Sequence, residues 1–539
     1  MKSNEILSIW KQNIKSKKLQ KELNMLDENQ IIERFSSYLE FGTAGLRGKI
    51  GIGSSFLNEY TVKLATSAVA EYVLSTKAKN PTVIVGYDTR KYSKQFAKCT
   101  SRILLNKGIN VYLAKEVVPS PFVSYLVNKM SASAGIMITA SHNPKEYNGY
   151  KVFDNRGCQI DTKTADFIAK IMKKMDVFDV FENKNIQKGT LRYIDDILKN
   201  KFLHDLSSVQ VLKKTSDVNI IYSPLNGTGA KFVPKILKMN GYKDIKIPIS
   251  QGFASSKFKT CPYPNPEELQ TYNESLKLTK NYNADIIILT DPDADRLGCM
   301  VKTENDYTFV NGNQIGLLML QYLLENKKTK NGFVVSSIVS SPMVEKMAKK
   351  YFIDCYLTLT GFKNIANKVD DVLKTNKKFI FAFEESNGYM PTTYTLDKDG
   401  ISASLLLVEM VSFYKSKNKT LYDVLKLIEN QTDYDFEARK YIILDGISGK
   451  NKIEEATNKL RNEKPKTLNG EKITKVVDYL SGNLETEKSN IISIETENNS
   501  KIIIRPSGTE PKLKFYSFAS TQQKAEKQID EIIQYLKLN

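Results

Sequence analysis

Three times along the chain, an apolar segment of strand length runs directly into a short polar loop. The three segments read AGIMITASHNP (134–144), ADIIILTDPDADR (284–296) and FIFAFEESNG (379–388). Ligands bind at the carboxyl ends of strands in open α/β sheets, so three such loops are expected to converge on one cleft. Strand-like and helical segments alternate between the loops, which predicts mixed, mostly parallel sheets with helices on both faces.

The 539 residues exceed what one hydrophobic core accommodates, so the chain is expected to divide into domains. The beginning is predicted to be helical, with Ile6, Leu7, Trp10 and Ile14 on one helix face. The end of the chain is predicted to be a helix with one apolar face, formed by Ala525, Ile529, Ile532, Ile533 and Leu536. The predicted units are a helical extension over 1–40, α/β domains over 41–205, 206–312 and 313–431, and a smaller α+β domain over 432–539.

The composition is typical of a soluble globular protein, with 41% hydrophobic and 26% charged residues. The first residues lack a charged-then-apolar signal pattern, and the longest apolar stretches are far shorter than a membrane span. Five scattered cysteines include no CxxC pair, so neither a zinc site nor a disulfide framework is indicated. We therefore expect a cytoplasmic protein with free thiols and no membrane partner.

The net charge of +19 raises the alternative of a nucleic-acid-binding protein. The lysines, however, are spread along the whole chain and do not form basic arms. This distribution favours a solvated surface with a bias toward small anionic substrates, and no nucleic-acid partner is expected.

The aspartate loop DPDADR (291–296) places Asp291, Asp293 and Asp295 at alternate positions after a buried strand. Three carboxylates this close repel one another unless a cation lies between them. Hard oxygen ligands suit Mg²⁺ or Ca²⁺, and three protein ligands leave room for a phosphate oxygen on Mg²⁺. An EF-hand is excluded, because Arg296 stands where that loop needs glycine and Lys302 where it needs glutamate.

The serine loop TASHNP (139–144) holds Ser141. A hydrolase triad would need a histidine base facing this serine. His142 is the next residue and is not expected to face Ser141, and His204 lies in a stretch predicted to be helical and structural. No GxSxG elbow is present. A serine near a magnesium loop instead favours a phosphoserine whose oxygens complete the metal shell.

The phosphate loop RPSGTEPK (505–512) follows the strand-like segment KIIIR. Arg505 can bind a phosphate in a bidentate manner. The backbone N–H groups of Ser507, Gly508 and Thr509 can form an anion nest. This loop is therefore a candidate phosphate site.

Three other segments are weaker signals. GLRG (45–48) sets Arg47 between glycines, where the backbone can approach an anion closely, and GYDTR (86–90) is expected to support it. In the glutamate loop EESNG (384–388), Glu384 and Ser386 would share one side of an extended segment and bind sugar hydroxyls. TGFK (360–363) adds Lys363, whereas GIGSS is a glycine loop without a Rossmann context, and no Walker A motif is present.

The serine, aspartate, glutamate and phosphate loops, in this order, resemble the α-D-phosphohexomutase superfamily over about residues 40 to 520. The resemblance implies four domains around a central cleft, the last similar to the TATA-box-binding-protein fold. It also implies an isomerase in which phosphorylated Ser141 transfers its phosphoryl group to a sugar monophosphate. The other phosphate of the resulting bisphosphate then returns to the serine. Mg²⁺ and glucose 1,6-bisphosphate are the implied cofactor and activator, and sugar phosphates the implied ligands of a monomer or homodimer.

The resemblance assigns roles to individual residues of this chain. The Mg²⁺ ligands would be the Ser141 phosphate, Asp291, Asp293 and Asp295. The reacting centre would be lined by Arg47, His142, Lys151, Arg296 and Lys363, with Lys151 favoured as the residue that moves the proton. The sugar and its non-reacting phosphate would be bound by Thr360, Gly361, Lys363, Glu384, Ser386, Arg505, Ser507, Gly508, Thr509 and Lys514.

Within the superfamily, FGTAGLRG, NGYKVF and the proline of the aspartate loop resemble the long-chain phosphoglucomutase and phosphopentomutase branch. Phe362 stands where the bacterial phosphomannomutase/phosphoglucomutase group has a histidine. The leading hypothesis is interconversion of glucose 1-phosphate and glucose 6-phosphate. The alternatives are a phosphopentomutase, a phosphomannomutase and, more distantly, a metal-dependent sugar phosphatase.

Overall fold

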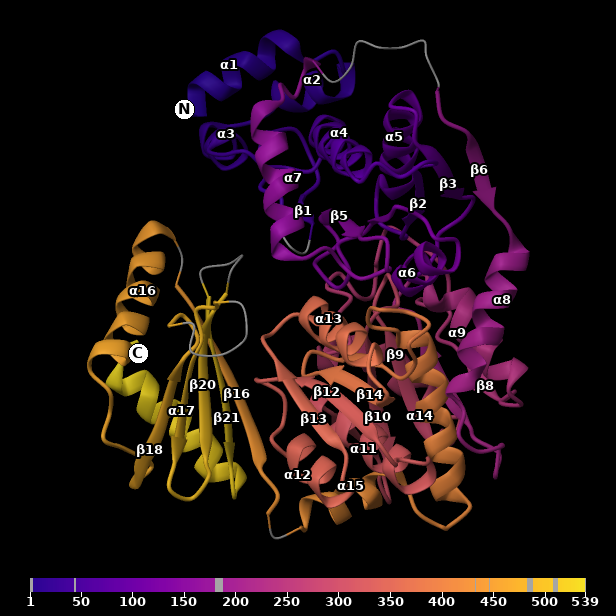
Figure 1. The fold of residues 1–539 in the computed structure, drawn as a ribbon, viewed down its shortest axis with the longest axis vertical. Helices are drawn as coiled ribbons and strands as arrows, with labels where there is room; N and C mark the ends of the chain where they lie inside the picture. The colour runs from indigo at the N-terminus through magenta and orange to yellow at the C-terminus, as the bar shows by residue number, and fades with distance from the viewer. Residues whose placement is uncertain are drawn as a thin grey trace.

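A computed structural model describes residues 3–42, 45–179, 188–431, 433–444, 446–481, 488–507 and 512–538. Within these residues the strands form four sheets, each with its own helices (Figure 1). We number the four domains by these sheets in chain order. Among the described helices, none combines the length and the apolar character needed to cross a membrane.

The N-terminal extension forms three short helices, which are α1 (Ser3–Asn13), α2 (Lys17–Leu23) and α3 (Glu28–Phe35). Trp10 of α1 is fully buried, and its ring lies 5.5 Å from that of Tyr60 and 5.4 Å from that of Phe178, between ring centroids. Both partners belong to domain 1. Burial of a large aromatic side chain is worth several kcal/mol, on the order of 3–5 for its removal to alanine. The extension is therefore docked firmly against domain 1.

Domain 1 contains a six-stranded sheet of order β1-β5-β4-β2-β3-β6. The neighbours from β4 to β6 pair in parallel, whereas β5 and β1 are antiparallel. The serine loop leaves the carboxyl end of β4, whose residues are all buried. The elements are β1 (Leu46–Lys49), α4 (Glu59–Ser75), β2 (Thr82–Tyr87), α5 (Ser93–Asn106), β3 (Asn110–Ala114), α6 (Ser120–Lys129), β4 (Ala134–Ile138), β5 (Tyr147–Phe153), α7 (Thr162–Lys174), β6 (Leu191–Ile194), α8 (Asp196–Leu206) and the 3₁₀ turn η2 (Ser207–Val209).

Domain 2 has a five-stranded sheet of order β11-β10-β9-β7-β8. The strands β8, β7 and β9 are parallel, and β9, β10 and β11 then form an antiparallel meander. The aspartate loop is the connection between β9 and β10, which pair from Thr290 and Leu297 onward. The elements are β7 (Ile220–Ser223), α9 (Gly229–Met239), β8 (Ile245–Lys246), η3 (Leu269–Tyr272), α10 (Asn273–Thr279), β9 (Ile286–Thr290), β10 (Leu297–Lys302) and β11 (Tyr307–Val310).

Domain 3 has a four-stranded sheet of order β13-β12-β14-β15, parallel except for β15. The glutamate loop joins β14 to β15. The elements are α11 (Gly312–Asn326), β12 (Gly332–Ser337), α12 (Met343–Lys350), β13 (Asp354–Thr358), α13 (Phe362–Leu373), β14 (Lys378–Glu384), β15 (Gly388–Met390), α14 (Gly400–Lys415) and α15 (Leu421–Glu429).

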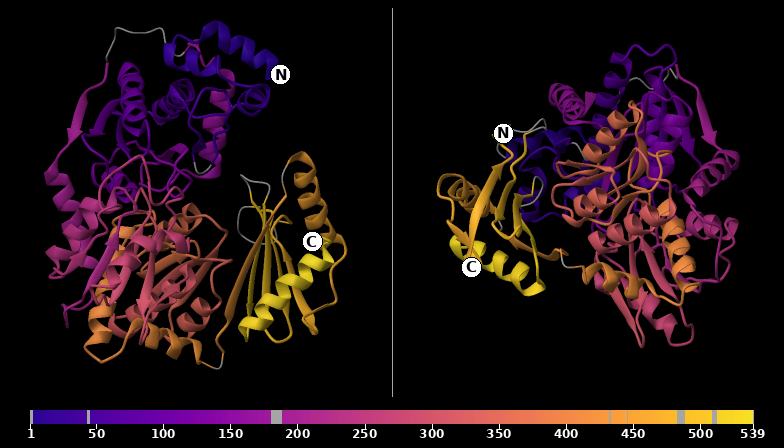
Figure 2. Two further views of the ribbon diagram at one scale, coloured as in Figure 1. Left: turned by 180° about the vertical axis from the view of Figure 1, so that it is seen from behind. Right: turned by 60° about the horizontal axis from the view of Figure 1, so that its bottom comes forward.

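Domain 4 is an antiparallel sheet of order β16-β21-β20-β19-β18-β17 with two helices on one face. Figures 1 and 2 show α16 and α17 on the face turned away from the other domains. The elements are β16 (Phe436–Ile443), α16 (Gly446–Asn462), β17 (Thr467–Leu468), β18 (Glu471–Asp478), β19 (Ile492–Thr496), β20 (Lys501–Pro506), β21 (Lys512–Ala519) and α17 (Gln522–Tyr535).

The buried apolar side chains pack in several clusters, including small separate ones in domain 2 and domain 3. One continuous cluster of buried side chains runs from Ile6 to Tyr434 and joins the extension with domains 1, 2 and 3. Domain 4 has a separate core between its sheet and its two helices. A small apolar cluster links domains 3 and 4, and its buried members are Ile338, Val339, Leu359, Ile491, Ile503, Tyr516 and Phe518. Alternate residues of β20 thus face the two sides of the sheet, as the period of a strand requires.

Candidate active site

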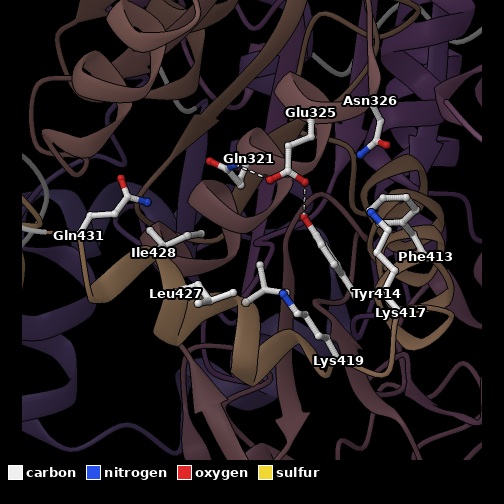
Figure 3. Close-up of a pocket in the computed structure, with 11 residues that line it drawn as sticks. Gln321, Glu325, Asn326, Phe413, Tyr414, Lys417, Lys419, Leu427, Ile428 and Gln431 are labelled. Carbon is white, nitrogen blue, oxygen red and sulfur yellow. Dashed lines mark hydrogen bonds between the residues drawn. The ribbon is translucent and has the colours of Figure 1, made fainter.

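A cavity of about 430 Å³ lies among α11, α14 and α15, outside the chemistry-bearing loops (Figure 3). Its Glu325 carboxylate accepts hydrogen bonds from Gln321 Nε2 (2.6 Å) and from the Tyr414 hydroxyl (3.0 Å). These polar groups satisfy one another. The predicted site residues do not line this cavity; Ser141, Asp291 and Glu384 lie at the ends of β4, β9 and β14.

Ser141 lies in the left-handed backbone region, with φ of 51°, and is 2% exposed. Its hydroxyl donates to Asp291 Oδ2 at 2.6 Å, so the serine and aspartate loops meet directly. The expectation that His142 would not face Ser141 is wrong, because Ser141 Oγ lies 3.2 Å from His142 Nδ1. The left-handed turn at Ser141 brings the two neighbouring side chains to the same side. Burial, with help from Arg296 and Arg47, lowers the pKa of His142 well below its ordinary value.

Arg90 holds the serine loop in place. Its Nη2 donates to the carbonyl oxygen of Ser141 at 2.6 Å, and its Nη1 donates to those of Pro144 (2.8 Å) and Tyr147 (2.9 Å). The segment GYDTR was expected to support the GLRG loop, but its arginine supports the serine loop instead. Arg47 approaches the same loop, and its Nη1 donates to Asn143 Oδ1 at 2.9 Å.

His204 is the second histidine of the chain, and its role differs from the structural one expected. It lies in α8, as predicted, but its side chain is 85% exposed. It therefore adds nothing to the core, and it is not among the residues that contact Ser141.

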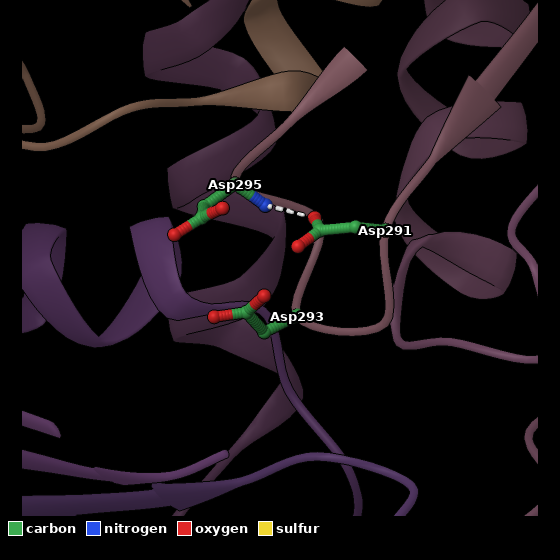
Figure 4. Close-up of side chains that lie close together, drawn as sticks. All are labelled: Asp291, Asp293 and Asp295. Atoms are coloured by element: carbon green, nitrogen blue, oxygen red, sulfur yellow. Dashed lines mark hydrogen bonds between the residues drawn. The ribbon is translucent and has the colours of Figure 1, made fainter. Parts of the chain in front are cut away.

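The aspartate loop gathers three buried carboxylates, with one oxygen from each lying within 4.8 Å of the others (Figure 4). Asp291 Oδ1 accepts from the backbone N–H groups of Asp295 (3.1 Å) and Arg296 (3.0 Å), which closes the loop. Asp293 Oδ1 and Asp295 Oδ1 are buried and have no hydrogen-bond partner. Burial, and then the charges of Asp293 and Asp295, raise the pKa of Asp291 well above its ordinary value. Such a donor set fits a hard divalent cation.

Two buried lysines neutralise part of this charge. Lys151 Nζ lies 3.0 Å from Asp293 Oδ2 and 2.8 Å from Asp295 Oδ2. Burial opposes the charged form of Lys151, but these carboxylates outweigh it and raise the pKa of Lys151 above its ordinary value. Lys398 Nζ lies 3.6 Å from Asp295 Oδ2. Lys398 could not be predicted from sequence, because the surrounding TLDKDG carries no signal beyond that of a polar turn.

Arg296 connects the aspartate loop to its surroundings. Its Nη1 donates to Glu267 Oε1 at 3.0 Å, within domain 2. Its backbone forms a bridge with Gly388 of domain 3, and the neighbouring Leu297 N–H donates to the carbonyl oxygen of Asn387 at 3.1 Å. The aspartate and glutamate loops are therefore fixed side by side.

The glutamate loop differs from its prediction. Glu384 is the last residue of β14 and pairs with Gly388, so Ser386 lies in a tight turn and not in an extended segment. The reason is that Asn387 adopts a left-handed conformation, with φ of 58°, and reverses the chain. Ser386 Oγ donates to Glu385 Oε1 at 3.2 Å. Burial raises the pKa of Glu384 to about 7, with Lys398 opposing the shift.

The segment TGFK lies at the start of α13. Lys363 reaches across to domain 1, where its Nζ donates to Thr162 Oγ1 at 2.7 Å. Phe362 is buried, and Lys398 Nζ lies 5.1 Å from the centre of its ring. Thr360 and Gly361 precede the helix, and Gly361 has a φ of 105°, a conformation that favours glycine.

Three basic residues of domain 4, namely Arg439, Arg505 and Lys514, lie on the side that faces domains 2 and 3. Arg505 and Lys514 are partners across β20 and β21, and the Ser507 N–H donates to the carbonyl oxygen of Lys512 at 2.7 Å. Arg439 of β16, which the sequence analysis missed, donates from Nη1 to the carbonyl oxygen of Glu385 at 3.2 Å. Gly508 and Thr509, also predicted to bind phosphate, lie outside the described residues.

Burial, reinforced by the charge of Arg505, lowers the pKa of Lys514, whereas Glu385 and Glu267 favour its charged form. Basic residues of domain 4 thus face the carboxylates beside the aspartate and glutamate loops. The serine, aspartate and glutamate loops therefore lie in one region, and Arg439 of domain 4 contacts it.

Comparison with known proteins gives the same architecture. Family models described as phosphoglucomutase/phosphomannomutase α/β/α domains I, II and III match residues 38–177, 192–304 and 311–431, and the C-terminal domain model matches 457–534. Phosphoglucomutases of Staphylococcus haemolyticus and Staphylococcus aureus are 34% and 33% identical to the chain. The alignments cover 89% and 90% of this chain and 90% of each relative.

Solved structures share the fold at lower sequence identity. A phosphoglucomutase/phosphomannomutase family protein from Burkholderia thailandensis has a TM-score of 0.72 at 17% identity, covering 93% of this chain and 98% of that one. The open form of parafusin, a phosphoglucomutase from Paramecium, has a TM-score of 0.69 at 20% identity, covering 94% and 95%. The matched family models and the staphylococcal relatives identify an isomerase of the intramolecular phosphotransferase class. More narrowly, the chain belongs to the phosphoglucomutase/phosphomannomutase family.

Proposed function

We propose that the protein interconverts glucose 1-phosphate and glucose 6-phosphate through a phosphorylated Ser141 and a bisphosphorylated sugar. The observation that carries this proposal is the 2.6 Å hydrogen bond between Ser141 and Asp291 within a buried carboxylate cluster. A serine hydroxyl beside cation-binding carboxylates suits phosphoryl transfer, which depends mainly on positioning and charge neutralisation. The phosphoglucomutase names of the staphylococcal relatives point to glucose phosphates as the substrates.

In each half of the reaction, one P–O bond breaks and another forms. The bond from phosphorus to Ser141 Oγ breaks, a bond to the free sugar hydroxyl forms, and the proton of that hydroxyl is taken up by a basic group. The same steps in reverse, at the other phosphate, restore the phosphoserine. Glucose 1,6-bisphosphate is the intermediate, and the same compound added from outside would act as activator.

The carboxylates of Asp291, Asp293 and Asp295 would hold a Mg²⁺ ion together with the Ser141 phosphate. When bound, the ion would supply charge neutralisation at the phosphoryl oxygens. Lys151 holds a proton at Nζ beside two of these carboxylates, so it is our choice for the proton donor to the departing oxygen. Arg47 and Arg296 would bind the reacting phosphate.

The rest of the substrate would be bound by domains 3 and 4. Glu384 and Ser386 would contact the sugar hydroxyls, with Thr360, Gly361 and Lys363 beside them. Arg505, Ser507, Gly508, Thr509 and Lys514 would bind the phosphate that does not react. Ser141 is nearly inaccessible, and this shielding from water favours a mutase over a phosphatase, because water would otherwise hydrolyse the phosphoserine.

A direct test compares kcat/KM for glucose 1-phosphate, mannose 1-phosphate and ribose 1-phosphate, with Mg²⁺ and a trace of sugar bisphosphate. We expect glucose 1-phosphate to be preferred by at least about tenfold, a difference of roughly 1.4 kcal/mol in transition-state binding. A preference for ribose 1-phosphate would move the protein to the phosphopentomutases and refute the glucose assignment. Stoichiometric release of inorganic phosphate would refute the mutase activity itself.

Replacing Arg505 by alanine should raise KM for glucose 1-phosphate about 10- to 100-fold and change kcat less. Charge-assisted hydrogen bonds to a phosphate are worth about 1.5–3 kcal/mol, and this phosphate is bound equally in ground and transition states. Lys475→Ala, at an exposed position of the same sheet, is the control. An unchanged KM in Arg505→Ala would remove this residue from the phosphate site.

A further inference from the structure

The helices of the N-terminal extension end before the residues matched by the family models, and they contact a loop beside the strand that carries Arg47. That loop, residues 51–55 (GIGSS), follows directly on β1, the strand that carries Arg47. We call it the glycine loop. The sequence of this loop is a weak signal for nucleotide binding. In the structure, its two glycines instead lie against the extension.

Glu22 of α2 and Arg34 of α3 hold the glycine loop between them. Glu22 Oε1 accepts from the backbone N–H of Ile52 at 3.1 Å and from Arg34 Nη1 at 2.6 Å. Arg34 Nη1 also donates to the carbonyl oxygen of Ile52 at 3.4 Å, and the Arg34 carbonyl oxygen accepts from the Ser55 N–H at 3.2 Å. Ser54 completes the contact, with its hydroxyl donating to the carbonyl oxygen of Ser37 at 2.6 Å.

The two segments approach closely at two glycines: backbone crowds Gly53, whereas at Gly51 the near atom ends the flexible Glu22 side chain and the φ of 156° favours glycine. A Cβ atom on Gly51 would lie 2.7 Å from Glu22 Oε1. A Cβ atom on Gly53 would lie 2.5 Å from the carbonyl oxygen of Arg34, and Gly53 has a φ of 135°. Real Cβ atoms do not approach other atoms this closely. The glycines therefore serve the contact with the extension.

The glycine loop in turn fixes the position of β1. This strand has four residues and lies at the edge of its sheet, where β5 is its one partner among the strands that the structure describes. A short edge strand has few ladder hydrogen bonds, so whatever contacts its free side contributes much of its positioning. The Leu57 N–H donates to the carbonyl oxygen of Lys49 at 2.9 Å, and the Gly51 N–H to that of Leu57 at 3.2 Å, which ties the loop back onto the strand end.

We propose that Glu22 and Arg34 are positioning residues that act through β1 to hold Arg47 at the serine loop. The connection runs from the carboxylate–guanidinium pair to the glycine loop, then to β1, and then to the contact of Arg47 with Asn143. The N-terminal extension is thus a part of the reacting centre's support. The inference deepens the proposed function and rests on it, because it assumes that Arg47 binds the reacting phosphate.

The test substitutes Glu22 by glutamine in the full-length protein, which keeps the shape but removes the charge that pairs with Arg34. We expect kcat for glucose 1-phosphate to fall about tenfold, with KM within about twofold of wild type and the far-UV circular dichroism unchanged. Glu28→Gln, on the exposed first turn of α3, is the control and should match wild type. If Glu22→Gln does not fold, Ser54→Ala is the second variant, because it removes a neighbouring contact of the same loop, the hydrogen bond from the Ser54 hydroxyl to the Ser37 carbonyl oxygen.

A double-mutant cycle with Arg47→Lys identifies the route. Lysine cannot reproduce the planar guanidinium contacts, so this substitution alone should lower kcat. If Glu22 acts through Arg47, Glu22→Gln should then cost less than about twofold in the Arg47→Lys background, since coupled residues are not additive. Two outcomes would overturn the inference while leaving the proposed function intact. One is an equal fall in kcat from Glu22→Gln in the wild-type and the Arg47→Lys proteins. The other is full activity of Glu22→Gln when Arg47→Lys is impaired. Full activity of Arg47→Lys would count against the proposed role of Arg47, and the inference would fail with it.

Discussion

Ser141→Ala is expected to abolish mutase turnover, with a loss of at least about 1,000-fold in kcat, while the domain structure stays intact. The loss is large because the hydroxyl oxygen is the atom that receives and donates the phosphoryl group, and no neighbouring group replaces it. The fold should survive, because the Ser141 side chain contributes only hydrogen bonds to Asp291 and His142. The backbone of the loop remains bound by Arg90.

The measurement is kcat in a coupled assay, together with phosphate incorporation from labelled glucose 1,6-bisphosphate. Wild-type protein should take up label at Ser141, and the Ser141→Ala variant should take up none. Ser208→Ala, at an exposed serine, is the matched control and should behave like wild type. Near-normal turnover in Ser141→Ala would refute the phosphoserine mechanism.

Asp293→Asn is expected to lower activity about 100-fold or more and to shift the Mg²⁺ titration to much higher concentrations. Asp293 Oδ1 is buried without a hydrogen-bond partner, so it is available to a cation, and a neutral amide oxygen is a weaker ligand than a carboxylate. Removing the charge also leaves Lys151 with one fewer partner, so thermal stability has to be measured alongside. Chelation of Mg²⁺ from the wild-type protein should reproduce the loss, and added Mg²⁺ should reverse it.

Asp217→Asn removes a carboxylate from an exposed ion pair with Lys214 and is the matched control. It should leave both the activity and the Mg²⁺ titration unchanged. A titration curve for Asp293→Asn that coincides with wild type would exclude Asp293 from the metal shell.

The positions of the serine and aspartate loops could be predicted from sequence because the relevant signals are local. Each loop directly follows a run of buried residues in a strand, and the carboxyl ends of such strands meet at one edge of a sheet. The contact between Ser141 and Asp291 is then a consequence of packing domain 1 against domain 2. The cation site at the aspartates could also be predicted from charge, because three neighbouring carboxylates need a counter-ion.

Other parts of the site could not be predicted, because they depend on single backbone angles or on distant neighbours. The contact of His142 with Ser141 follows from one left-handed residue, and the turn at Ser386 from another at Asn387. Lys398 and Arg439 lie in segments without a motif, and only the packing of domains brings them to Asp295 and Glu385. Sequence periodicity reports which face of an element is buried but not what lies opposite that face.

The separation of the core of domain 4 from the main apolar cluster has a consequence for how this protein can change over evolutionary time. Side chains of the extension and of domains 1, 2 and 3 share the main cluster, beside smaller clusters in domains 2 and 3. A volume change within the main cluster therefore requires compensation among neighbours that lie far apart in the sequence. Domain 4 packs around its own cluster and meets domain 3 through a small apolar contact. Substitutions inside domain 4 can therefore accumulate independently, provided that the contact with domain 3 and the basic residues facing the site persist. Away from those residues, the core of domain 4 can thus diverge in sequence without repacking the main cluster.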